Sequence, residues 1–501
     1  MRHGFILLLG LVLSLPAAAS TVRLVAATPL MAYADPLALD GGNGIVPSVF
    51  DSLTKVLPDG SVGPALATAW RNESDTVWVF ELRDGVSFSN GAPLTADLVV
   101  DCLRHMTTPA GRATPNAIET ATIAAVRALG PRTVEITTTT PDARLPRKLS
   151  RLRIWHMPSF EKAGRSAFSR APVGTGPYVI ERWVNGEAGV VMTANPKAWR
   201  PSAEVDRVEV AIVTDATVRL QILLAGDADL AANLDPDTIA VLEGEGLSAH
   251  IQDAPVVLAL ALRNVDGTIA PLKDPRVRRA LNMAVDRQRI VDTLLYGTMN
   301  AAGQIATPGV VGYDPALAAY PYDPDRAREL LAEAGYPVGF AMTAGVFSGQ
   351  IPGDTLIFQQ VAQDLATIGV RLELRRLAFS DFNRRRIAGD WGDMSAFSYV
   401  WSHYQLGDIS RSVEQSSCLA PAPWFCLPEL MGEIEAANRA LQPVERERLL
   451  KVISARLHDV APSLLLVQYA SIVGVAETVD HFELETDAIQ FGKMRMRAGA
   501  P

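Results

Sequence analysis

The stretch Asp274-Pro-Arg-Val-Arg-Arg-Ala-Leu-Asn-Met-Ala-Val-Asp286 carries two helix-start signals in close succession. Asp274 can cap a helix whose first position is Pro275, where a residue without an N–H is well tolerated. An apolar stripe at helical spacing follows, made of Val277, Leu281, Ala284 and Val285. Asp286 can cap a second helix, which Gly297 would end. The stretch therefore predicts two short helices in series.

Helical and extended patterns alternate along the rest of the chain. Alternating or β-branched runs predict strands at residues 76–82, 134–140, 205–213 and 370–374. Helical spacing predicts a helix that Thr95 caps, and further helices at residues 216–225, 325–334 and 354–368. This alternation favours a mixed α/β fold over a sandwich or a helical bundle. At roughly 100–200 residues per domain, the 501 residues predict two or three domains.

The first residues have the features of an export signal. Arg2 gives a positive start, residues 5–15 are apolar, and residues 17–19 are three alanines. Cleavage after Ala19 would leave Ser20 first. The apolar run is too short to span a bilayer, no Cys follows it to carry a lipid, and no later run reaches spanning length. We expect residues 1–19 to be removed and the rest to be soluble and periplasmic.

Charge and motifs exclude several classes of function. The formal net charge is -9, which argues against a nucleic-acid partner. The basic runs Arg278-Arg279 and Arg384-Arg385-Arg386 are expected on solvated helix faces. No phosphate-binding loop, G-x-S-x-G elbow or H-E-x-x-H helix occurs. We expect no enzyme, no cofactor and no metal site, with a secreted hydrolase as the alternative.

The cysteines fit an oxidising compartment. Cys102 lies on the apolar stripe of a predicted helix and is expected to be a buried thiol. Cys418 and Cys426 flank a Pro-rich loop, so we expect them to form a disulfide. A metal site is disfavoured there because no His lies close by in the sequence.

Several motifs in order resemble one family. They lie at residues 50–60, 64–70, 79–91 and 94–97, in Pro172-Val-Gly-Thr-Gly-Pro-Tyr178, in the 274–286 stretch and at residues 322–335. Together they resemble the family 5 extracellular solute-binding proteins of ABC importers, the class that includes peptide, nickel and opine transport.

The resemblance implies a two-lobed periplasmic-binding-protein fold of type II, in its large variant. Lobe I would comprise residues 20–255 and 470–501, and would include an extra subdomain at about 50–168. Lobe II would comprise residues 256–469. The lobes would close on a ligand by hinge bending.

The resemblance also implies a function. A monomer would capture a small peptide, a peptide-like solute or a metal chelate and deliver it to a membrane permease driven by a separate ATPase. A binding protein used in signalling or chaperoning is a further alternative.

The resemblance places candidate ligand-binding residues in two main regions. By loose alignment, Arg151 falls near an arginine that holds carboxylates of metal chelates in nickel-binding members, and a shift of two residues would select Arg153 instead. A basic strand edge at the surface explains both residues equally well. Trp401 would line the cleft, and a core position is the competing interpretation.

The sequence after Trp401 departs from the family pattern. In many peptide-binding relatives an Asp shortly after this Trp receives the peptide amine, whereas here residues 402–407 intervene before Asp408. Either Asp408 reaches back, or the amine anchor is missing. His403 could contribute to a chelate, although a lone His is more often a hydrogen-bonding residue. Tyr33 and Asp35 are further candidates because their loop borders the cleft in relatives.

Overall fold

The computed structural model describes residues 20–27, 33–38, 44–185, 188–200, 204–265, 268–349, 351–404, 406–485 and 488–497. The predicted export signal, residues 1–19, lies outside the described residues. No helix within these ranges is both long enough and apolar enough to cross a bilayer.

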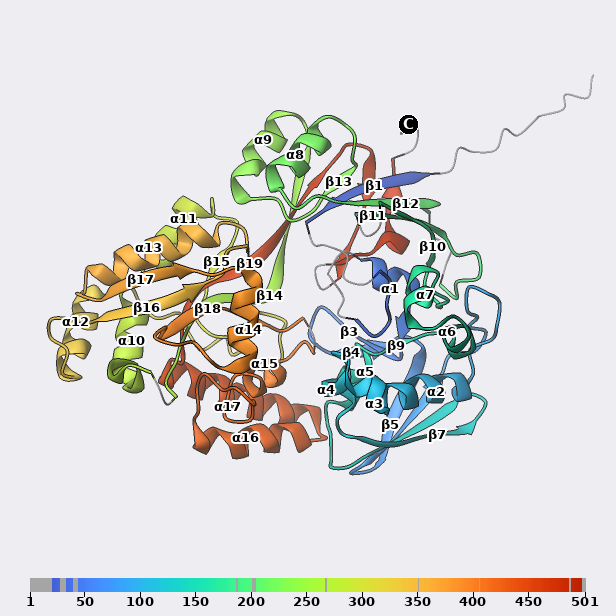
Figure 1. Cartoon of the computed structure of the whole chain (residues 1–501), viewed down its shortest axis with the longest axis horizontal. Helices are drawn as coiled ribbons and strands as arrows, with labels where there is room; N and C mark the ends of the chain where they lie inside the picture. The colour runs from blue at the N-terminus through green and yellow to red at the C-terminus, as the bar shows by residue number, and fades with distance from the viewer. Residues whose placement is uncertain are drawn as a thin grey trace, which may run out of the picture.

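Two lobes lie on either side of two long strands, β14 and β19 (Figure 1). One eleven-stranded sheet runs through both lobes in the order β10-β11-β12-β1-β13-β19-β14-β18-β16-β17, with β15 paired to β19. Its strands are β1 (Thr21–Ala26), β10 (Tyr178–Val184), β11 (Gly189–Ala194), β12 (Arg207–Ile212), β13 (Leu230–Ala231), β14 (Ser248–Leu262), β15 (Asn300–Ala301), β16 (Ala341–Val346), β17 (Arg371–Arg376), β18 (Ala396–Ser402) and β19 (Ser463–Val475). The predicted two-lobed α/β fold is confirmed.

The pairing of β14 with β19 is interrupted between the lobes. Asp253 lies opposite Ala470, whereas the next paired residue, Val257, lies opposite Gln468. The extra residues of β14 form a bulge, which bends a strand locally. The predicted lobe boundaries, after residues 255 and 469, fall at this bulge, although the division itself stays a prediction.

The segment predicted to form the extra subdomain contains a four-stranded antiparallel sheet, and we keep the predicted name for it. Its strands are β5 (Ala67–Ser74), β6 (Val77–Leu82), β8 (Thr133–Thr138) and β7 (Ile123–Gly130). Helix α2 (Ala96–Thr107) packs on this sheet, and Thr95 caps it as predicted by accepting the Leu98 N–H. Shorter elements complete it: β2 (Asp51–Ser52), β3 (Thr54–Val56), β4 (Val62–Pro64), α3 (Pro109–Arg112), α4 (Ala117–Thr120), α5 (Leu145–Leu149), β9 (Arg153–Ile154), α6 (Met157–Ala163) and α7 (Arg165–Arg170).

The rest of lobe I, in the residues that the structure describes, carries further α-helices and the C-terminal strands. These are α1 (Ile45–Val49), α8 (Ala216–Leu224), α9 (Ile239–Gly244), β20 (Val479–His481), β21 (Leu484–Glu485), β22 (Ala488–Ile489) and β23 (Arg495–Met496). The Tyr178 hydroxyl contacts the carbonyl oxygens of both Val205 and Phe491, at 2.9 and 3.1 Å. The end of the chain therefore packs back onto lobe I.

Lobe II has helices on both faces of its part of the sheet. They are α10 (Pro275–Met283), α11 (Arg287–Leu294), α12 (Pro324–Glu333), α13 (Asp354–Ala366), α14 (Phe379–Ala388), α15 (Ser410–Glu414), α16 (Pro428–Arg439) and α17 (Pro443–Val460). Alternate residues of β14 serve the two faces, since Leu258 packs in one hydrophobic core and Val257 in the other. Asp274 and Asp286 cap α10 and α11 as predicted.

One expectation from the basic runs is wrong. Arg278 is only 2% exposed, and it donates hydrogen bonds to the carbonyl oxygens of Val460 and Leu272 at 2.6 and 2.8 Å. Helix ends leave carbonyl groups without partners, and a guanidinium can satisfy several of them at once. Arg278 therefore ties α10 to the end of α17.

The structure has the predicted disulfide and the predicted buried thiol. Cys418 and Cys426 form a disulfide in lobe II, and Cys102 is a buried free thiol.

Candidate functional site

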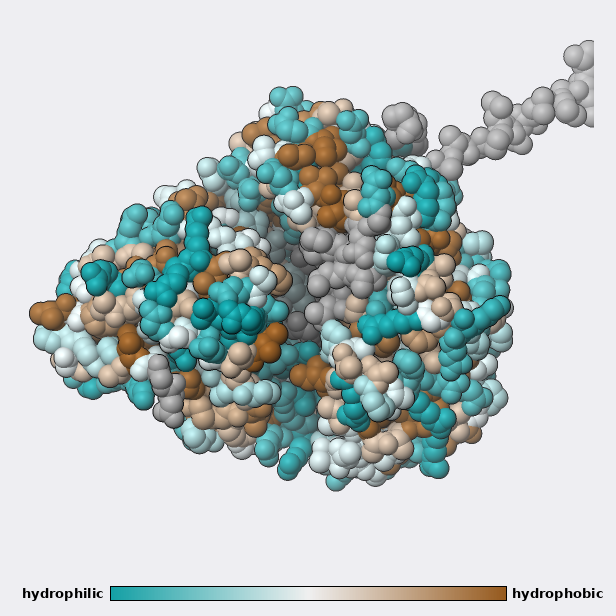
Figure 2. Space-filling view, viewed as in Figure 1, coloured by the Kyte–Doolittle hydropathy of each residue, from teal (hydrophilic) through white to brown (hydrophobic). Residues whose placement is uncertain are grey.

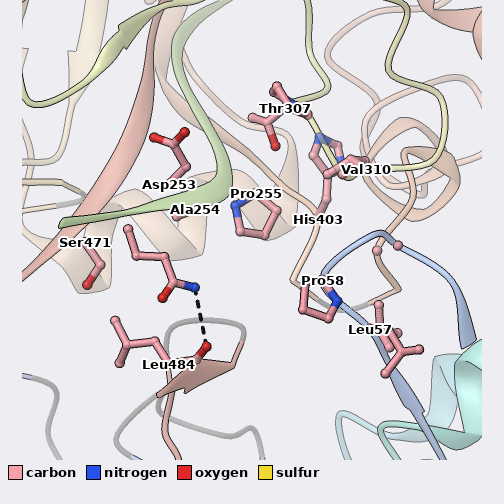
Figure 3. A pocket seen from close by; sticks show the side chains of 16 residues that line it. Leu57, Pro58, Asp253, Ala254, Pro255, Thr307, Val310, His403, Ser471 and Leu484 are labelled. Carbon is pink, nitrogen blue, oxygen red and sulfur yellow. Dashed lines mark hydrogen bonds between the residues drawn. The ribbon is translucent and has the colours of Figure 1, made fainter. Parts of the chain in front are cut away.

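A pocket of about 140 Å³ lies between the lobes, next to the β14 bulge (Figure 3). The extra subdomain contributes the tip of the β3–β4 hairpin, and β14, β19 and two lobe II loops contribute the opposite wall. The lining residues are Val56, Leu57, Pro58, Gly60, Gln252, Asp253, Ala254, Pro255, Thr307, Pro308, Gly309, Val310, His403, Gly407, Ser471 and Leu484. The pocket is therefore formed jointly by both lobes.

The pocket is apolar on the hairpin side and polar on the side of the long strands. Leu57 and Pro58 face Asp253 and Ser471 across it in Figure 3. Asp253 is exposed, and its carboxylate accepts one hydrogen bond from the Asn300 amide at 3.4 Å. Among the described lining residues there is no Lys or Arg. The charge available to a ligand from these residues is therefore negative.

Gln252 fixes the edge of the pocket next to Asp253. Its side-chain amide donates to the Leu484 carbonyl at 3.4 Å, which joins β14 to the C-terminal hairpin of β21 and β22. Figure 3 shows this bond as a dashed line.

His403 lines the pocket but both its ring nitrogens have partners. Nε2 lies 2.8 Å from the Ile305 carbonyl oxygen, and Nδ1 lies 3.3 Å from Oγ of Ser412. Burial lowers the pKa of His403, so the ring is neutral at pH 7 and Nε2 donates. A metal ion at either nitrogen would have to displace one of these contacts. No group of three potential metal ligands occurs among the residues that the structure describes.

The contact between His403 and Ser412 bears on the hydrolase alternative. Ser412 is 5% exposed, its hydroxyl donates to the Ile409 carbonyl, and it does not line the pocket. The other ring nitrogen of His403 meets a backbone carbonyl where a triad would place a carboxylate. This geometry gives the pair no substrate-facing nucleophile.

Asp408 is buried away from the pocket. Its carboxylate lies 2.8 Å from Arg446 and 3.6 Å from Arg147, and it accepts the Ser410 N–H at the start of α15. Burial alone would raise the pKa of Asp408, but the two guanidinium groups outweigh it and lower the pKa to about 2. The charge of Asp408 is thus compensated within the protein.

The two candidate arginines lie in the extra subdomain outside the pocket lining. Arg151 is half-buried, with Nε 3.4 Å from Glu119. Arg153 lies in β9, opposite Ser52 of β2. Neither residue is among those that line the pocket. Their neighbour Lys148 is buried and the side chain of Arg147 is only 11% exposed, so this segment as a whole is not a solvated basic edge.

Trp401 occupies a core position in lobe II. Its side chain has no exposed surface, and its indole N–H donates to the Ser463 hydroxyl at 3.0 Å. The rings of Tyr399 and Trp424 contact it at 5.2 and 5.7 Å between centroids. In this structure Trp401 supports the wall of the cleft from behind.

The candidates of the first loop lie on lobe I. Tyr33 packs edge-on against Trp183, and the Arg170 guanidinium lies 4.9 Å from the centre of its ring. Asp35 is buried and pairs with Arg165 at 2.8 Å. Neither Tyr33 nor Asp35 lines the pocket.

Asp253 is one of the pocket residues that sequence reasoning missed, and it is the only carboxylate among the described lining residues. An acidic residue followed by Ala-Pro comes directly before the apolar run of β14 at residues 256–262, and a proline inside a strand marks an edge or a bulge. That signal locates the bulge. It does not say what the carboxylate faces, because the opposite wall comes from residues far away in the sequence.

Comparison with known proteins gives consistent matches. A family model described as bacterial extracellular solute-binding proteins, family 5 middle, matches residues 61–408. The di/tripeptide-binding protein 2 of Pseudomonas aeruginosa is 27% identical over 379 residues, covering 70% of each chain. The nickel-binding periplasmic protein of Escherichia coli is 28% identical over 463 residues, covering 86% of this chain and 85% of that protein. The crystal structure of NikA from Brucella suis in complex with Fe(III)-EDTA superposes with a TM-score of 0.81 at 22% identity, covering 95% of this chain and all of the other.

Proposed function

Because the chain belongs to family 5 of the bacterial extracellular solute-binding proteins, we propose that it is a periplasmic receptor for a small amine-bearing, peptide-like solute. It binds the solute between its lobes and delivers it to the permease and ATPase subunits of an ABC importer. It acts as a monomer and catalyses no reaction. Residues 1–19 direct its export and are then removed.

The position of Asp253 carries the choice of ligand class. An exposed carboxylate in a pocket whose described lining has no Lys or Arg attracts a protonated amine. A chelate rich in carboxylates would meet repulsion in the same place. The occupied nitrogens of His403 likewise favour an organic solute over a metal ion.

The names of the relatives agree with a small solute of this kind. One matched relative is named for di- and tripeptides and another for nickel. Of these two, the peptide has the free amine that Asp253 can accept. The pocket also presents hydroxyl groups on Thr307 and Ser471, which can bond a peptide group.

The remaining candidate residues support the site indirectly in this proposal. Asp408, Trp401, Arg151 and Arg153 hold the walls, and Tyr33 and Asp35 hold the first loop against lobe I. His403 contacts the solute through its ring edge.

Calorimetric titration with dialanine and N-acetyl-dialanine tests the proposal. We expect dialanine to bind and the acetylated compound, which has no charged amine, to bind at least roughly tenfold more weakly. Asp253→Asn should abolish that difference, whereas Asp75→Asn, which changes an exposed carboxylate on the extra subdomain, should preserve it. Equal binding of the two compounds by the unmodified protein, or tighter binding of nickel citrate than of dialanine, would overturn the proposed ligand class.

Cell fractionation and a mass measurement in solution test the proposed location, the removal of residues 1–19 and the monomeric state. The mature chain should appear in the periplasmic fraction with Ser20 first, and light scattering should give the mass of a monomer. A membrane-bound or cytoplasmic chain would contradict the proposed location, and a dimer would contradict the stoichiometry.

A further inference from the structure

Ion pairs join the extra subdomain to lobe II on the side of the cleft opposite the long strands. There α15 and α16 lie beside α4 and α5 (Figure 1). Arg144 of the subdomain lies 2.7 Å from Glu414 of α15. Arg411 of the same helix pairs with Glu119 at the end of α4. These two pairs run in opposite directions, so each side of the junction supplies a cation and an anion.

The junction is largely shielded from water. The side chains of Arg144 and Arg411 are each 11% exposed, that of Glu119 is 2% and that of Glu414 is 22%. Buried ions that lose a partner are strongly destabilised, whereas exposed pairs contribute little. Parting of the lobes would break all these pairs together and return the ions to water.

Backbone contacts accompany the ion pairs. Arg147 donates to the Leu406 carbonyl at 2.7 Å, and the Ala143 N–H donates to the Asn438 carbonyl at 2.9 Å. At the hairpin tip, a Cβ on Gly60 would lie 2.3 Å from the carbonyl oxygen of Gly309. The subdomain and lobe II therefore touch closely at several points besides the ion pairs.

We propose that the Arg144–Glu414 and Arg411–Glu119 pairs form a charge latch that holds the lobes closed before any solute binds. Gly60 of the hairpin tip and Gly407 of lobe II both line the pocket, and a Cβ on Gly60 would lie 3.2 Å from the Gly407 carbonyl oxygen, so the two lobes meet there. In the space-filling view (Figure 2) the lobes are separated by a hollow above and touch below it. The latch closes the lower side of the pocket, and the long strands close the opposite side.

The latch has a consequence for affinity. A solute that binds only the closed form has an apparent affinity in proportion to the population of that form. Loss of a latch residue would weaken binding of every solute by the same factor, without any change in which solute is preferred. Salt would act in the same direction, because it stabilises the separated charges.

Small-angle X-ray scattering of the solute-free protein tests the latch. The variants are Glu414→Gln and Arg411→Gln, and the control is Arg375→Gln, which breaks an exposed pair with Asp393 within lobe II. We expect the unmodified protein and the control to scatter as the closed form. In each latch variant the closed-to-open ratio should fall roughly a hundredfold, seen as a larger radius of gyration with an unchanged circular dichroism spectrum.

Two further measurements separate a latch from general loss of stability. Arg144→Gln should open the protein about as much as Glu414→Gln, and the double variant should open it less than the two effects added, because the two side chains share one interaction across the junction, although Arg144 also lies 3.5 Å from Asp142. Raising NaCl from about 50 mM to about 500 mM should open the unmodified protein. A solute-free protein that is open at low salt, or latch variants as closed as Arg375→Gln, would overturn the proposal. No solute is used, so either result leaves the amine-ligand proposal to its own test.

Discussion

Nη2 of Arg446 lies 2.8 Å from Oδ2 of Asp408, and the two side chains are 6% and 0% exposed. The pair lies wholly within lobe II, and Arg147 of the extra subdomain approaches the same carboxylate at 3.6 Å. Asp408 is therefore the point at which the packing of lobe II meets the junction between the lobes. Because both arginines already pair with this carboxylate, Asp408 is not available to bind the amine of a ligand.

Removing the charge of Asp408 should destabilise the protein strongly. Asp408→Asn would leave the buried Arg446 without its ionic partner, and breaking such a pair costs about 3–5 kcal/mol. Urea unfolding should show this loss, whereas Asp393→Asn, in an exposed pair with Arg375, should change stability by under about 1 kcal/mol. A fall of under 1 kcal/mol for Asp408→Asn would contradict the structural role given to this residue.

The same carboxylate should make stability depend on acid pH. Its pKa is about 2 in the folded protein against an ordinary value of 3.8, so its contribution is complete above about pH 4 and is lost as the pH falls towards 2. The contribution is about 2 kcal/mol, from the size of the pKa difference. The difference in unfolding free energy between the unmodified protein and Asp408→Asn, measured from pH 7 to pH 2, should shrink by about that amount in this window. A constant difference across the range would refute it.

Reduction of the disulfide should weaken lobe II. Cys418 and Cys426 are 8 residues apart, and closing a loop of that length in the unfolded chain corresponds to about 2–3 kcal/mol. Calorimetry of the Cys418→Ser, Cys426→Ser double variant should show a lower melting temperature. Dithiothreitol should lower the melting temperature of the unmodified protein only. The same response to the reductant in both proteins would contradict this assignment.

Shortening Trp401 should affect packing more than solute binding. Trp401→Ala would leave a cavity in a core where the ring is fully buried, at a cost of about 3–5 kcal/mol. Trp401→Phe keeps most of the volume and loses the hydrogen bond to Ser463. With Trp401→Phe we expect dialanine affinity within about twofold of the unmodified protein. A tenfold loss with a native circular dichroism spectrum would show that Trp401 reaches the ligand.

Local signals in the sequence predicted the elements of the fold well. Thr95, Asp274 and Asp286 each cap the helix they were expected to cap, because a cap bonds an N–H only two or three residues away. The order of strands and helices, together with the motifs of the family, led to the two-lobed fold. The caps, the element order and the motifs can each be recognised from short stretches of residues that are adjacent in the sequence.

The candidate site was harder to predict. Arg151, Trp401 and Asp408 were singled out by position along the chain, yet none of them lines the pocket. Asp253 was not singled out, although it lies two residues before the predicted lobe boundary at residue 255. A pocket wall is made of side chains that meet only when distant segments pack, and a single sequence does not report those meetings.

Arg278 and Arg144 illustrate the division between what the chain encodes locally and what packing decides. The sequence by itself determined the family, the α/β alternation and the helix caps, because these depend on contacts within one or two turns. Only the tertiary structure decided that Arg278 is buried on carbonyls of α17, and that Arg144 meets Glu414, 270 residues further along the chain. A charged side chain is about as stable in water as in a well-made ion pair. Whether it is buried or exposed therefore depends on whether the fold places a partner from a distant part of the chain beside it.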